Sequence, residues 1–582
     1  MIILGINAFG HDSSASIIID DILVFAVEEE RLTRKKHDGR FPILSIQACL
    51  DYAKISISDV DHITFFWKPS LTIKHIPVYF FKFFSKVPKL LKEQRNFEVE
   101  ENLGMLNYIK DMYGVPKLIR NSFKNGATAK FKFHYIEHHL CHAASAFFPS
   151  KFEDAAILTI DGAGEWATTL LAHGKGTKIQ KITTINTPYS VGAFYQAISM
   201  HLGFKLIEGP GKLMALASFG NPNGDIYKKL KGLFTFDDNG KYSFDMNYFS
   251  YHYSRKSGVS EKFNTLFGPS KIGTGDWNQD QLDLAASAQR IVEELFLHMG
   301  TYLKKVTNSE NICLAGGVAL NSVANGKLIQ SGLFKNIFIQ PAAGDSGTSL
   351  GSAFYLNHQT LNRPRKYVME TAFLGQSYSP QDYETELKNA KLNYVNFGEN
   401  IYKTTAKILA KNYIIGWFQG AMEYGPRALG NRSILASPFP KDMKDTINNR
   451  IKFRESFRPF AAIVNEEECS KYFTYHLPNP YMLLVYGVKE EYQQLMPAIT
   501  HVDGTVRIQT VNEKENYNMR MLLNEFKAIS GHPVVLNTSF NIKAEPIVCS
   551  PKDAVNSFVN SDLDYLVIGN FLATKGLPLE IV

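Results

Sequence analysis

Cysteine is scarce in this chain of 582 residues, and long apolar runs are missing. The five cysteines are odd in number, widely scattered and never arranged as Cys-x-x-Cys, which argues against a disulfide framework and a thiolate zinc site. No apolar run approaches the roughly 18 residues that a membrane-spanning helix needs. Residues 1–6 are apolar and lack a basic leader, so we expect a β-strand there instead of a signal peptide, and a cytoplasmic protein.

The proportions of apolar and charged residues, 45% and 20%, are those of an ordinary globular protein. A chain of this length exceeds what one hydrophobic core supports, so two or more domains are expected. Residues 357–366 are polar and contain a proline, as linkers often do. We therefore predict one domain over residues 1–362 and a second over residues 363–582.

Three histidines lie within residues 138–142, in a segment rich in helix formers. His138 and His142 are four residues apart, so a helix would place both imidazoles on one face, one turn apart. A helix offers two nitrogen ligands to one metal ion in this way. His139 is also close to His142 along a helix, which leaves a His139–His142 pair as the alternative. The pattern predicts a metal site.

Two hairpin patterns repeat in the N-terminal part. Residues 3–19 and 157–171 each combine an apolar strand, a turn of small and polar residues, and a second strand. Together they resemble the duplicated halves of the actin/hexokinase-like (ASKHA) phosphotransferase fold, an α/β fold in which the turns face a nucleotide cleft. Residues 314–321 and 341–351 are Gly-rich and run from an apolar strand into a helix, which suits either a nucleotide or tight packing.

The C-terminal part concentrates arginines in loops that also contain Gly and Pro. They occur within residues 423–433, 450–459 and 501–507, and residues 537–541 add Asn and Ser. Guanidinium groups suit the oxygens of phosphates and carboxylates, so the pattern predicts an anion site. Some of these arginines could instead be ion-pair partners, as Arg454 could be near Glu455.

The net positive charge is concentrated in residues 68–132, which contain thirteen Lys and Arg against five Asp and Glu, so the rest of the chain is nearly neutral. Aromatic residues alternate with the lysines, as in residues 78–84, so the segment could bind nucleic acid or a membrane surface. Only Arg95 and Arg120 are arginines, and lysine stems pack well along apolar surfaces. We expect an amphipathic insertion that shapes the acceptor side of the N-terminal cleft or a subunit contact, without RNA binding.

The order of these motifs resembles the NodU/CmcH family of O-carbamoyltransferases, which includes a tobramycin carbamoyltransferase. The resemblance runs from Gly5 to about Leu566. It rests on the histidine motif, the arginine loops and the following short motifs: residues 10–15, 28–31, 36–37, 161–162, 316–321 and 344–347. It implies a domain like the tRNA threonylcarbamoyl transferase (TsaD-like), followed by a YrdC-like α/β domain.

The same resemblance implies the activity. The C-terminal domain would form carbamoyl-adenylate from carbamoyl phosphate and ATP, with Mg²⁺. The N-terminal domain would then transfer the carbamoyl group to a hydroxyl of a small molecule, such as a natural product, a sugar or an antibiotic-like secondary metabolite. No membrane or nucleic-acid partner is expected, and a homodimer is compatible with the pattern.

Residue roles carried over from the family cover both domains. Iron(II) or a similar divalent metal would be held by His138, His142, Asp161 and Asp345. His11 would be the general base for the acceptor hydroxyl. Nucleotide contacts in the N-terminal domain would come from Lys36, Gly317 and Asn321. The carbamoyl phosphate and ATP site would be lined by Arg427, Lys452, Arg458, Arg507, Asn537 and Ser539.

Three other functions compete with this one. A tRNA-modifying enzyme of the threonylcarbamoyl type would account for the basic segment, and it predicts tRNA affinity that falls with salt. A hydrogenase-maturation carbamoyltransferase would add an acylphosphatase module and Cys-x-x-Cys zinc fingers, and this sequence contains neither. A nucleotide-gated interaction protein would leave the arginine-rich half without a role.

Overall fold

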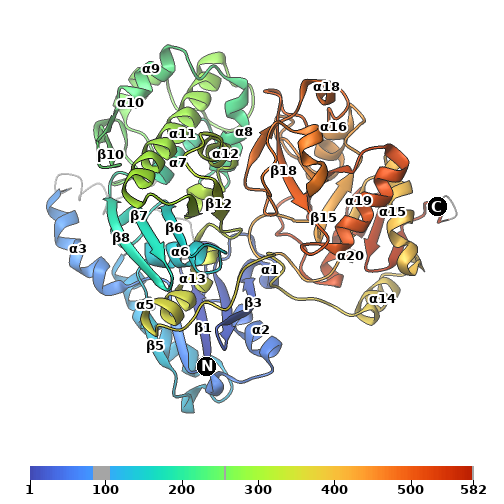
Figure 1. The fold of residues 1–582 in the computed structure, drawn as a ribbon, viewed down its shortest axis with the longest axis horizontal. Coiled ribbons are helices and arrows are strands. Elements are labelled where there is room, and N and C mark those ends of the chain that lie inside the picture. Colours follow the sequence, from blue (N-terminus) through green and yellow to red (C-terminus); the bar gives the residue numbers. More distant parts are fainter. Residues whose placement is uncertain (83–104, 255–256, 580–582) are drawn as a thin grey trace. The chain divides into compact units, whose positions relative to one another are not determined.

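The computed structural model describes residues 1–82, 105–254 and 257–579. They form two compact units (Figure 1). Unit 1 comprises Met1–Glu29 and Asp38–Met369, and unit 2 comprises Glu30–His37 and Glu370–Val582. No helix in the described part of the chain is long and apolar enough to cross a membrane. Part of the basic aromatic segment, residues 83–104, lies outside the described residues.

The described part of unit 1 contains two five-stranded sheets with the same plan, ordered β3-β2-β1-β4-β5 and β12-β11-β6-β7-β8. In each, a central strand pairs antiparallel with the next strand of its hairpin and parallel with a later one. The first sheet consists of β1 (Ile2–Asn7), β2 (Ser14–Ile19), β3 (Ile22–Glu28), β4 (His62–Phe65) and β5 (Lys132–Tyr135). The second consists of β6 (Asp154–Ile160), β7 (Ala167–Lys175), β8 (Lys178–Asn186), β11 (Asn311–Ala315) and β12 (Asn336–Ile339). This repetition confirms the predicted duplicated fold, and β1 confirms the opening strand.

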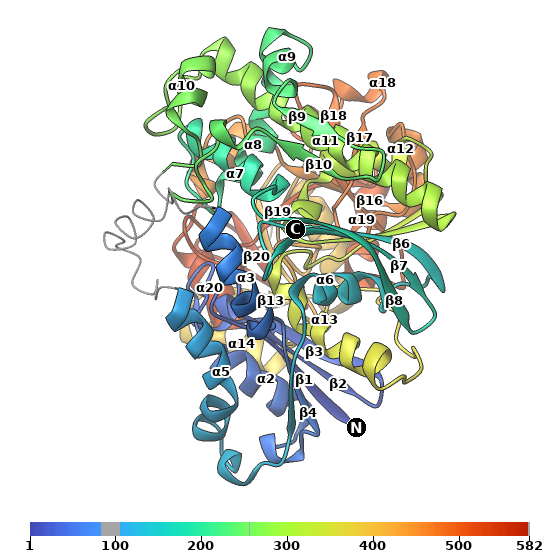
Figure 2. The same cartoon turned by 90° about the vertical axis from the view of Figure 1, so that its left-hand side faces the viewer.

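Two buried helices, α6 (His138–Phe147) and α13 (Thr348–Phe354), lie between these sheets (Figures 1 and 2). Every residue of α6 is buried, because it packs on strands of the second sheet and on α13. The contact between the helices depends on Gly351, where a Cβ would lie 1.9 Å from the carbonyl oxygen of Cys141. The backbones of α6 and α13 can approach this closely only because Gly351 has no side chain.

The other elements of unit 1 surround this core. The 29-residue α11 (Gln279–Thr307) packs against α12 (Ser322–Gln330) and β6, and a capping box of Asn278 and Gln281 starts it. The remaining helices are α2 (Ile43–Ala53), α3 (Pro69–Lys82), α5 (Met105–Ser122), α7 (Val191–His201), α8 (Gly209–Leu216), α9 (Asp225–Lys231) and α10 (Glu261–Phe267). A small hairpin pairs β9 (Phe234–Phe236) with β10 (Tyr242–Phe244), and the short α1 (Glu29–Thr33) leads from unit 1 into the Glu30–His37 segment of unit 2.

The predicted linker at residues 357–366 begins inside a π-helical turn, Tyr355–Thr360, whose Asn357 and His358 are buried. Arg365 then donates hydrogen bonds to the backbone carbonyls of Phe147 and Ser150, at 3.1 and 2.6 Å. These bonds hold the stretch against unit 1, which ends at Met369.

Unit 2 is built on a nine-stranded mixed sheet in its described residues, ordered β13-β21-β20-β14-β15-β19-β16-β18-β17. Its strands are β13 (Asn393–Asn396), β14 (Ile415–Phe418), β15 (Arg432–Ala436), β16 (Ala461–Asn465), β17 (Val485–Gly487), β18 (Thr505–Val511), β19 (Val534–Ser539), β20 (Tyr565–Ile568) and β21 (Phe571–Thr574). Its helices are α14 (Pro380–Asn389), α15 (Ile401–Ala410), α16 (Met443–Ile447), α17 (Cys469–Tyr472), α18 (Glu490–Gln493), α19 (Tyr517–Ser530) and α20 (Pro551–Val559). α15 and α19 pack together over a core that includes Trp417, Leu522 and Phe526.

Candidate functional site

Four side chains converge at the inner ends of the two sheets of unit 1: His138, His142, Asp161 and Asp345. Their candidate ligand atoms all lie within 4.8 Å of one another. α6 supplies both histidines from its first and fifth residues, Asp161 follows the end of β6, and Asp345 opens the short 3-10 turn before α13. The structure therefore brings together all four residues that the resemblance implied as metal ligands.

The distances in this cluster fit a shared cation. Nε2 of His138 lies 3.1 Å from Nε2 of His142 and 3.2 Å from Oδ2 of Asp161. Both Nε2 atoms lie 3.7 Å from Oδ1 of Asp345, a buried oxygen that accepts no hydrogen bond from the described residues. A buried carboxylate oxygen without a donor is costly unless a cation or donor satisfies it. Two imidazoles and two carboxylates suit a borderline divalent metal.

His139 points elsewhere. Its Nδ1 lies 2.7 Å from the hydroxyl of Thr159 on β6. Burial lowers the pKa of His139 well below its ordinary value, and the neighbouring imidazoles of His138 and His142 lower it further. The geometry thus places the i,i+4 pair, and not the i,i+3 pair, at the cluster.

His11 lies beside the cluster, in the turn between β1 and β2. Its Nε2 is 3.9 Å from Oδ2 of Asp345, its Nδ1 is 3.0 Å from Oδ2 of Asp12, and its side chain is 50% exposed. Partial loss of hydration lowers the pKa of His11, but the carboxylates of Asp345, Asp12 and Asp161 raise it more, to about 10. A cation held by Asp345 and Asp161 would offset that negative charge and favour the neutral imidazole that a general base requires.

Gly317 and Asn321 support the cluster from the Gly-rich turn of residues 314–321. The backbone N–H of Gly317 donates to Oδ1 of Asp161 at 2.8 Å, which leaves Oδ2 directed at the histidines. Asn321 caps α12 by accepting from the N–H of Ala324 at 3.1 Å, and its amide pairs with Gln289. At Gly316, φ is +89° and a Cβ would lie 2.2 Å from the carbonyl oxygen of Ile160, so this turn requires glycine.

Three residues that the sequence analysis missed line the cluster. Glu165 is buried and accepts backbone hydrogen bonds from His138 at 3.1 Å and Lys68 at 2.7 Å, and burial raises its pKa to about 7. The Trp67 ring lies 5.2 Å from that of His138 and 6.0 Å from that of Tyr108 on α5. Burial raises the pKa of the Tyr108 phenol, and the charges of Asp345 and Glu165 raise it further. Of these three residues, only Glu165 could have been selected from the sequence, because it lies in the same turn as Asp161.

Unit 2 contains a cluster of opposite charge, which we call the cationic cluster: Arg427, Lys452, Arg454, Arg458 and Arg507. Burial lowers the pKa of Arg427 to about 10 and that of Arg454 to about 9, and the Arg458 charge lowers both further. The pKa of Arg507 is lowered by burial and then by the charges of Arg427, Arg454 and Arg458. The charges of these four arginines therefore act on one another, and Nε of Arg507 is buried without an acceptor among the described residues.

The sheet aligns Arg507 with Asn537. Ala461 on β16 pairs with Arg507 on one side and with Asn537 on the other, so the two polar side chains emerge on one face across a single strand. The Asn537 amide donates to the carbonyl of Ala428 at 2.9 Å. Its Oδ1 is buried and receives no hydrogen bond from the described residues. An acceptor oxygen and the Arg507 side chain thus lie on the same face of the sheet, one strand apart.

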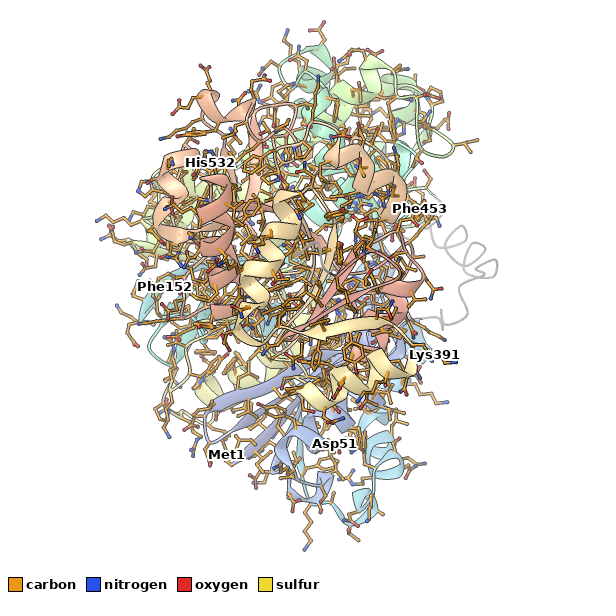
Figure 3. All side chains as sticks on the ribbon, turned by 90° about the vertical axis from the view of Figure 1, so that its right-hand side faces the viewer. Met1, Asp51, Phe152, Lys391, Phe453 and His532 are labelled. Carbon is orange, nitrogen blue, oxygen red and sulfur yellow. The ribbon has the colours of Figure 1, made fainter. Side chains whose placement is uncertain are left out.

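Lys452 is held inside the cluster by residues at and just beyond the end of β19, the strand that contains Asn537. Its Nζ donates to the backbone carbonyls of Ser539 and Asn541 and to Oδ1 of Asn541, at 2.5, 3.0 and 2.7 Å. Phe453, next in the chain, has φ of +46° and is 56% exposed (Figure 3), so the backbone turns Lys452 and Arg454 inward on either side of it. Burial lowers the pKa of Lys452 well below its ordinary value, and the charges of Arg454 and Arg458 add to this effect.

Arg454 and Asn541 belong to this site although the sequence analysis did not select them. Arg454 donates from Nε to Oδ1 of Asn448 at 2.8 Å, while the ion pair with Glu455, at 4.0 Å, is formed by Arg458. The loop that carries Arg427 is organised by buried Glu423, whose Oε1 accepts the N–H groups of Leu429, Asn431 and Arg432 at 2.8–3.0 Å. Lys36, which with Gly317 and Asn321 was expected to contact a nucleotide in the N-terminal domain, lies in the Glu30–His37 segment of unit 2.

Both halves of the chain match the same family of known proteins. Residues 2–354 match the family model "Carbamoyltransferase N-terminus", and residues 406–575 match "Carbamoyltransferase C-terminus". An uncharacterized protein of Synechocystis sp. is 40% identical, with 98% of this chain and 96% of that protein covered. Nodulation protein NolNO of Sinorhizobium fredii is 36% identical, with 98% and 80% covered. Nodulation protein NolO of Bradyrhizobium diazoefficiens is 39% identical, with 76% and 79% covered.

Among solved structures, a component of (R)-2-hydroxyglutaryl-CoA dehydratase from Acidaminococcus fermentans matches at 14% identity and a TM-score of 0.31. The alignment covers 61% of this chain and 97% of that one. HypF of T. kodakarensis matches at 10% identity and a TM-score of 0.29, with 62% and 48% covered. The duplicated strand order, and not these distant likenesses, supports the fold assigned to unit 1.

Proposed function

Because this chain belongs to the carbamoyltransferase family, we propose that it is an ATP-dependent O-carbamoyltransferase with two active centres. The proposal assigns carbamoyl phosphate and ATP to the cationic cluster of unit 2, and a small hydroxylated acceptor to the His–Asp cluster of unit 1. The observation that supports it best is the cationic cluster itself, because a bound polyanion would offset the mutual repulsion of its buried arginine charges.

The first half-reaction would join a carbamoyl group to the α-phosphate of ATP. Phosphorus atoms balance only if inorganic phosphate leaves together with pyrophosphate. Water therefore cleaves the phosphate from carbamoyl phosphate, and an oxygen of the resulting carbamate attacks the α-phosphorus of ATP. The bond from that phosphorus to the bridging oxygen breaks, and pyrophosphate leaves with Mg²⁺ as its counter-ion. The product is carbamoyl-adenylate.

Residues of unit 2 suit each part of these substrates. The forked guanidinium groups of Arg427, Arg458 and Arg507 can donate to phosphate oxygens. The buried Oδ1 of Asn537 can accept from the NH₂ group of carbamoyl phosphate. Lys452 and Ser539 hold the adjoining strand end in place through the hydrogen bond between them.

The second half-reaction would take place in unit 1. A divalent metal held by His138, His142, Asp161 and Asp345 would supply positive charge that polarises the carbamoyl carbonyl. His11, oriented by Asp12, would remove the proton from the acceptor hydroxyl as its oxygen attacks the carbamoyl carbon. The bond to the adenylate oxygen breaks and AMP leaves. Trp67 and Tyr108 form an aromatic wall beside the cluster, so α5 of the basic segment would contribute to the acceptor side.

Product analysis tests the proposal. Purified protein with ATP, Mg²⁺ and carbamoyl phosphate should release pyrophosphate and inorganic phosphate in equal amounts, and neither when carbamoyl phosphate is omitted. Addition of hydroxylated metabolites should then identify acceptors by AMP release and a mass increase of one carbamoyl group. No pyrophosphate release under these conditions would contradict the proposal.

A tRNA binding titration at two salt concentrations examines the alternative function. Tight binding that weakens steeply with salt, without turnover of any small hydroxylated compound, would favour a tRNA-modifying enzyme. Weak binding at both salt concentrations, together with AMP release from a small acceptor, would exclude it.

A further inference from the structure

The turn between β6 and β7, residues 161–166, contacts two other parts of unit 1. Asp161 at its start is a candidate metal ligand. Gly164 lies against the ring of His138, where a Cβ would be 3.1 Å from Cδ2. The next two residues, Glu165 and Trp166, extend beyond the metal cluster, and the chemistry proposed for unit 1 gives neither of them a role.

Glu165 joins the start of α6 to the connection that follows β4. Its Oε1 accepts the backbone N–H of Lys68 at 2.7 Å and that of His138 at 3.1 Å. Its Oε2 accepts from the same His138 N–H at 3.2 Å. His138 is the first residue of α6, and the side chain of the preceding Glu137 does not cap the helix. The buried carboxylate of Glu165 therefore caps α6 from another segment of the chain.

The connection after β4 carries part of the aromatic wall. The ring of Trp67, the residue before Lys68, lies 5.2 Å from that of His138. Trp166, the residue after Glu165, stacks on His75 of α3, with ring centroids 4.8 Å apart and ring planes 9° apart. The turn that supplies a metal ligand thus also holds the start of α3.

A carboxylate suits this junction because both groups that meet it are donors. Backbone N–H groups cannot bond to each other, so a group with acceptor oxygens has to stand between them. The two hydrogen bonds of Glu165 fix the backbone of Lys68 relative to that of His138. The ring of Trp67 and the imidazole of His138 depend on these backbone positions, so a shift of one segment is transmitted to the other.

We propose that Glu165 is a positioning residue that couples the metal site to the aromatic wall. It holds the backbones of His138 and Lys68 at one carboxylate, so that a bound metal also fixes Trp67. This inference rests on the proposed function, in which metal and acceptor share this part of unit 1. Coupling of two binding sites is reciprocal, so an acceptor that packs on Trp67 would bind more tightly to the metal-loaded protein.

A titration with Co²⁺, followed by its visible absorption, tests the positioning of His138 without turnover and without an acceptor. We expect Glu165→Ala to weaken Co²⁺ binding roughly tenfold, as loss of groups that orient metal ligands commonly does. Glu165→Gln should recover most of the affinity, because its amide oxygen can take the place of Oε1. Glu137→Ala is the matched control: it removes a carboxylate from the residue next to His138, but that carboxylate pairs with Lys181, and Co²⁺ should bind as to the wild type.

Amide hydrogen exchange, measured by mass spectrometry on peptides that contain Lys68 or His138, tests the coupling itself. In the wild type, Co²⁺ should slow exchange in both peptides, because the bound state opens less often. In Glu165→Ala with saturating Co²⁺, exchange should slow only in the peptide of α6. A residue that merely stabilised unit 1 would change exchange equally with and without Co²⁺.

The outcomes separate this inference from the function on which it rests. If Glu165→Ala binds Co²⁺ as tightly as Glu137→Ala does, the inference is wrong and the proposed function stands. The same holds if Co²⁺ leaves exchange at Lys68 unchanged in the wild type, a measurement that decides the question even if Glu165→Ala does not fold. Equally weak binding by Glu165→Gln and Glu165→Ala would also contradict the inference, because an acceptor oxygen would then not be what positions His138. If the wild type binds no Co²⁺, the metal assignment of the proposed function fails as well.

Discussion

At the scale of single residues, two neighbouring histidines in one helix turn have different environments. The His142 imidazole faces His138 and two carboxylates, whereas the His139 imidazole faces the hydroxyl of Thr159. At 100° per residue, His139 is rotated by about 100° from His138 and about 60° from His142, so its ring points toward β6 and not into the cluster.

This difference predicts the effect of removing each imidazole on metal content. We expect the purified protein to contain about one iron or similar divalent ion per chain, as a single four-ligand site implies. His142→Ala should lose most of it, and His139→Ala should retain it. Elemental analysis of the three proteins measures this, and equal metal content in the wild type and His142→Ala would refute the metal assignment.

Glu515 in unit 2 predicts a pH dependence of stability. Burial raises its pKa from 4.5 to about 7, and the nearby charges of Glu466 and Glu370 contribute to the increase. Because the folded state favours the protonated carboxyl, its stabilising effect is present below the unfolded pKa and is lost as pH rises through about 7. From about pH 5 to pH 8 the wild type should therefore lose on the order of 2 kcal/mol relative to Glu515→Gln.

Denaturant unfolding of both proteins at the two pH values measures this difference. Glu513→Gln, at an exposed position two residues away, is the control and should follow the wild type. A wild type and a Glu515→Gln variant that change in parallel with pH would show that Glu515 ionises normally.

At the scale of elements, the packing of α6 against α13 determines whether the four candidate ligands meet. α6 holds His138 and His142, and Asp345 lies in the turn that leads into α13. Gly351 permits the close contact between the helices, as Gly5 permits the approach of β1 to the carbonyl of Ser349, where a Cβ would lie 2.0 Å away.

Gly351→Ala should therefore weaken the metal site without changing a ligand. Its new Cβ would overlap the carbonyl oxygen of Cys141, so the helices must separate at a cost of roughly 1–3 kcal/mol. We expect a lower unfolding midpoint and weaker metal binding by titration. Gly344→Ala is the matched control, because its Cβ would meet no atom within 4 Å. Normal metal affinity in Gly351→Ala would show that helix spacing does not position the ligands.

At the scale of the whole molecule, two sites of opposite charge lie in separate units. The cluster of unit 1 presents carboxylates and imidazoles, and that of unit 2 presents guanidinium and ammonium groups. If each unit catalyses its own half-reaction, a substitution in one unit should stop that half-reaction and leave the other one intact.

Arg507→Ala should reduce pyrophosphate release from ATP and carbamoyl phosphate at least tenfold, because loss of a charge-assisted contact costs roughly 1.5–3 kcal/mol. His11→Asn should leave pyrophosphate release nearly intact and abolish carbamoyl transfer to the acceptor. A His11→Asn variant that stops pyrophosphate release as completely as Arg507→Ala does would show that this division of labour is wrong.

Local patterns in the sequence were sufficient for several features. Helical periodicity placed His138 and His142 on one face of α6, and alternation with polar turns located the hairpins of β1–β2 and β6–β7. Glycines after apolar runs predicted the turns before α12 and α13. These features depend on residues within a few positions of one another, where backbone geometry alone fixes their relation.

Tertiary structure decided what depends on distant contacts. Spacing could not show that Asp345 reaches histidines some 200 residues earlier in the chain, because a parallel β-strand order and a helix contact at Gly351 bring them together. Nor could it show that Glu165 and Trp67 line the cluster, or that Glu30–His37 packs with unit 2. Hydrogen bonds from buried Arg31 and partly buried Arg34 hold that segment. Their acceptors are backbone carbonyls, which are alike at every position of a sequence and become specific only in the fold.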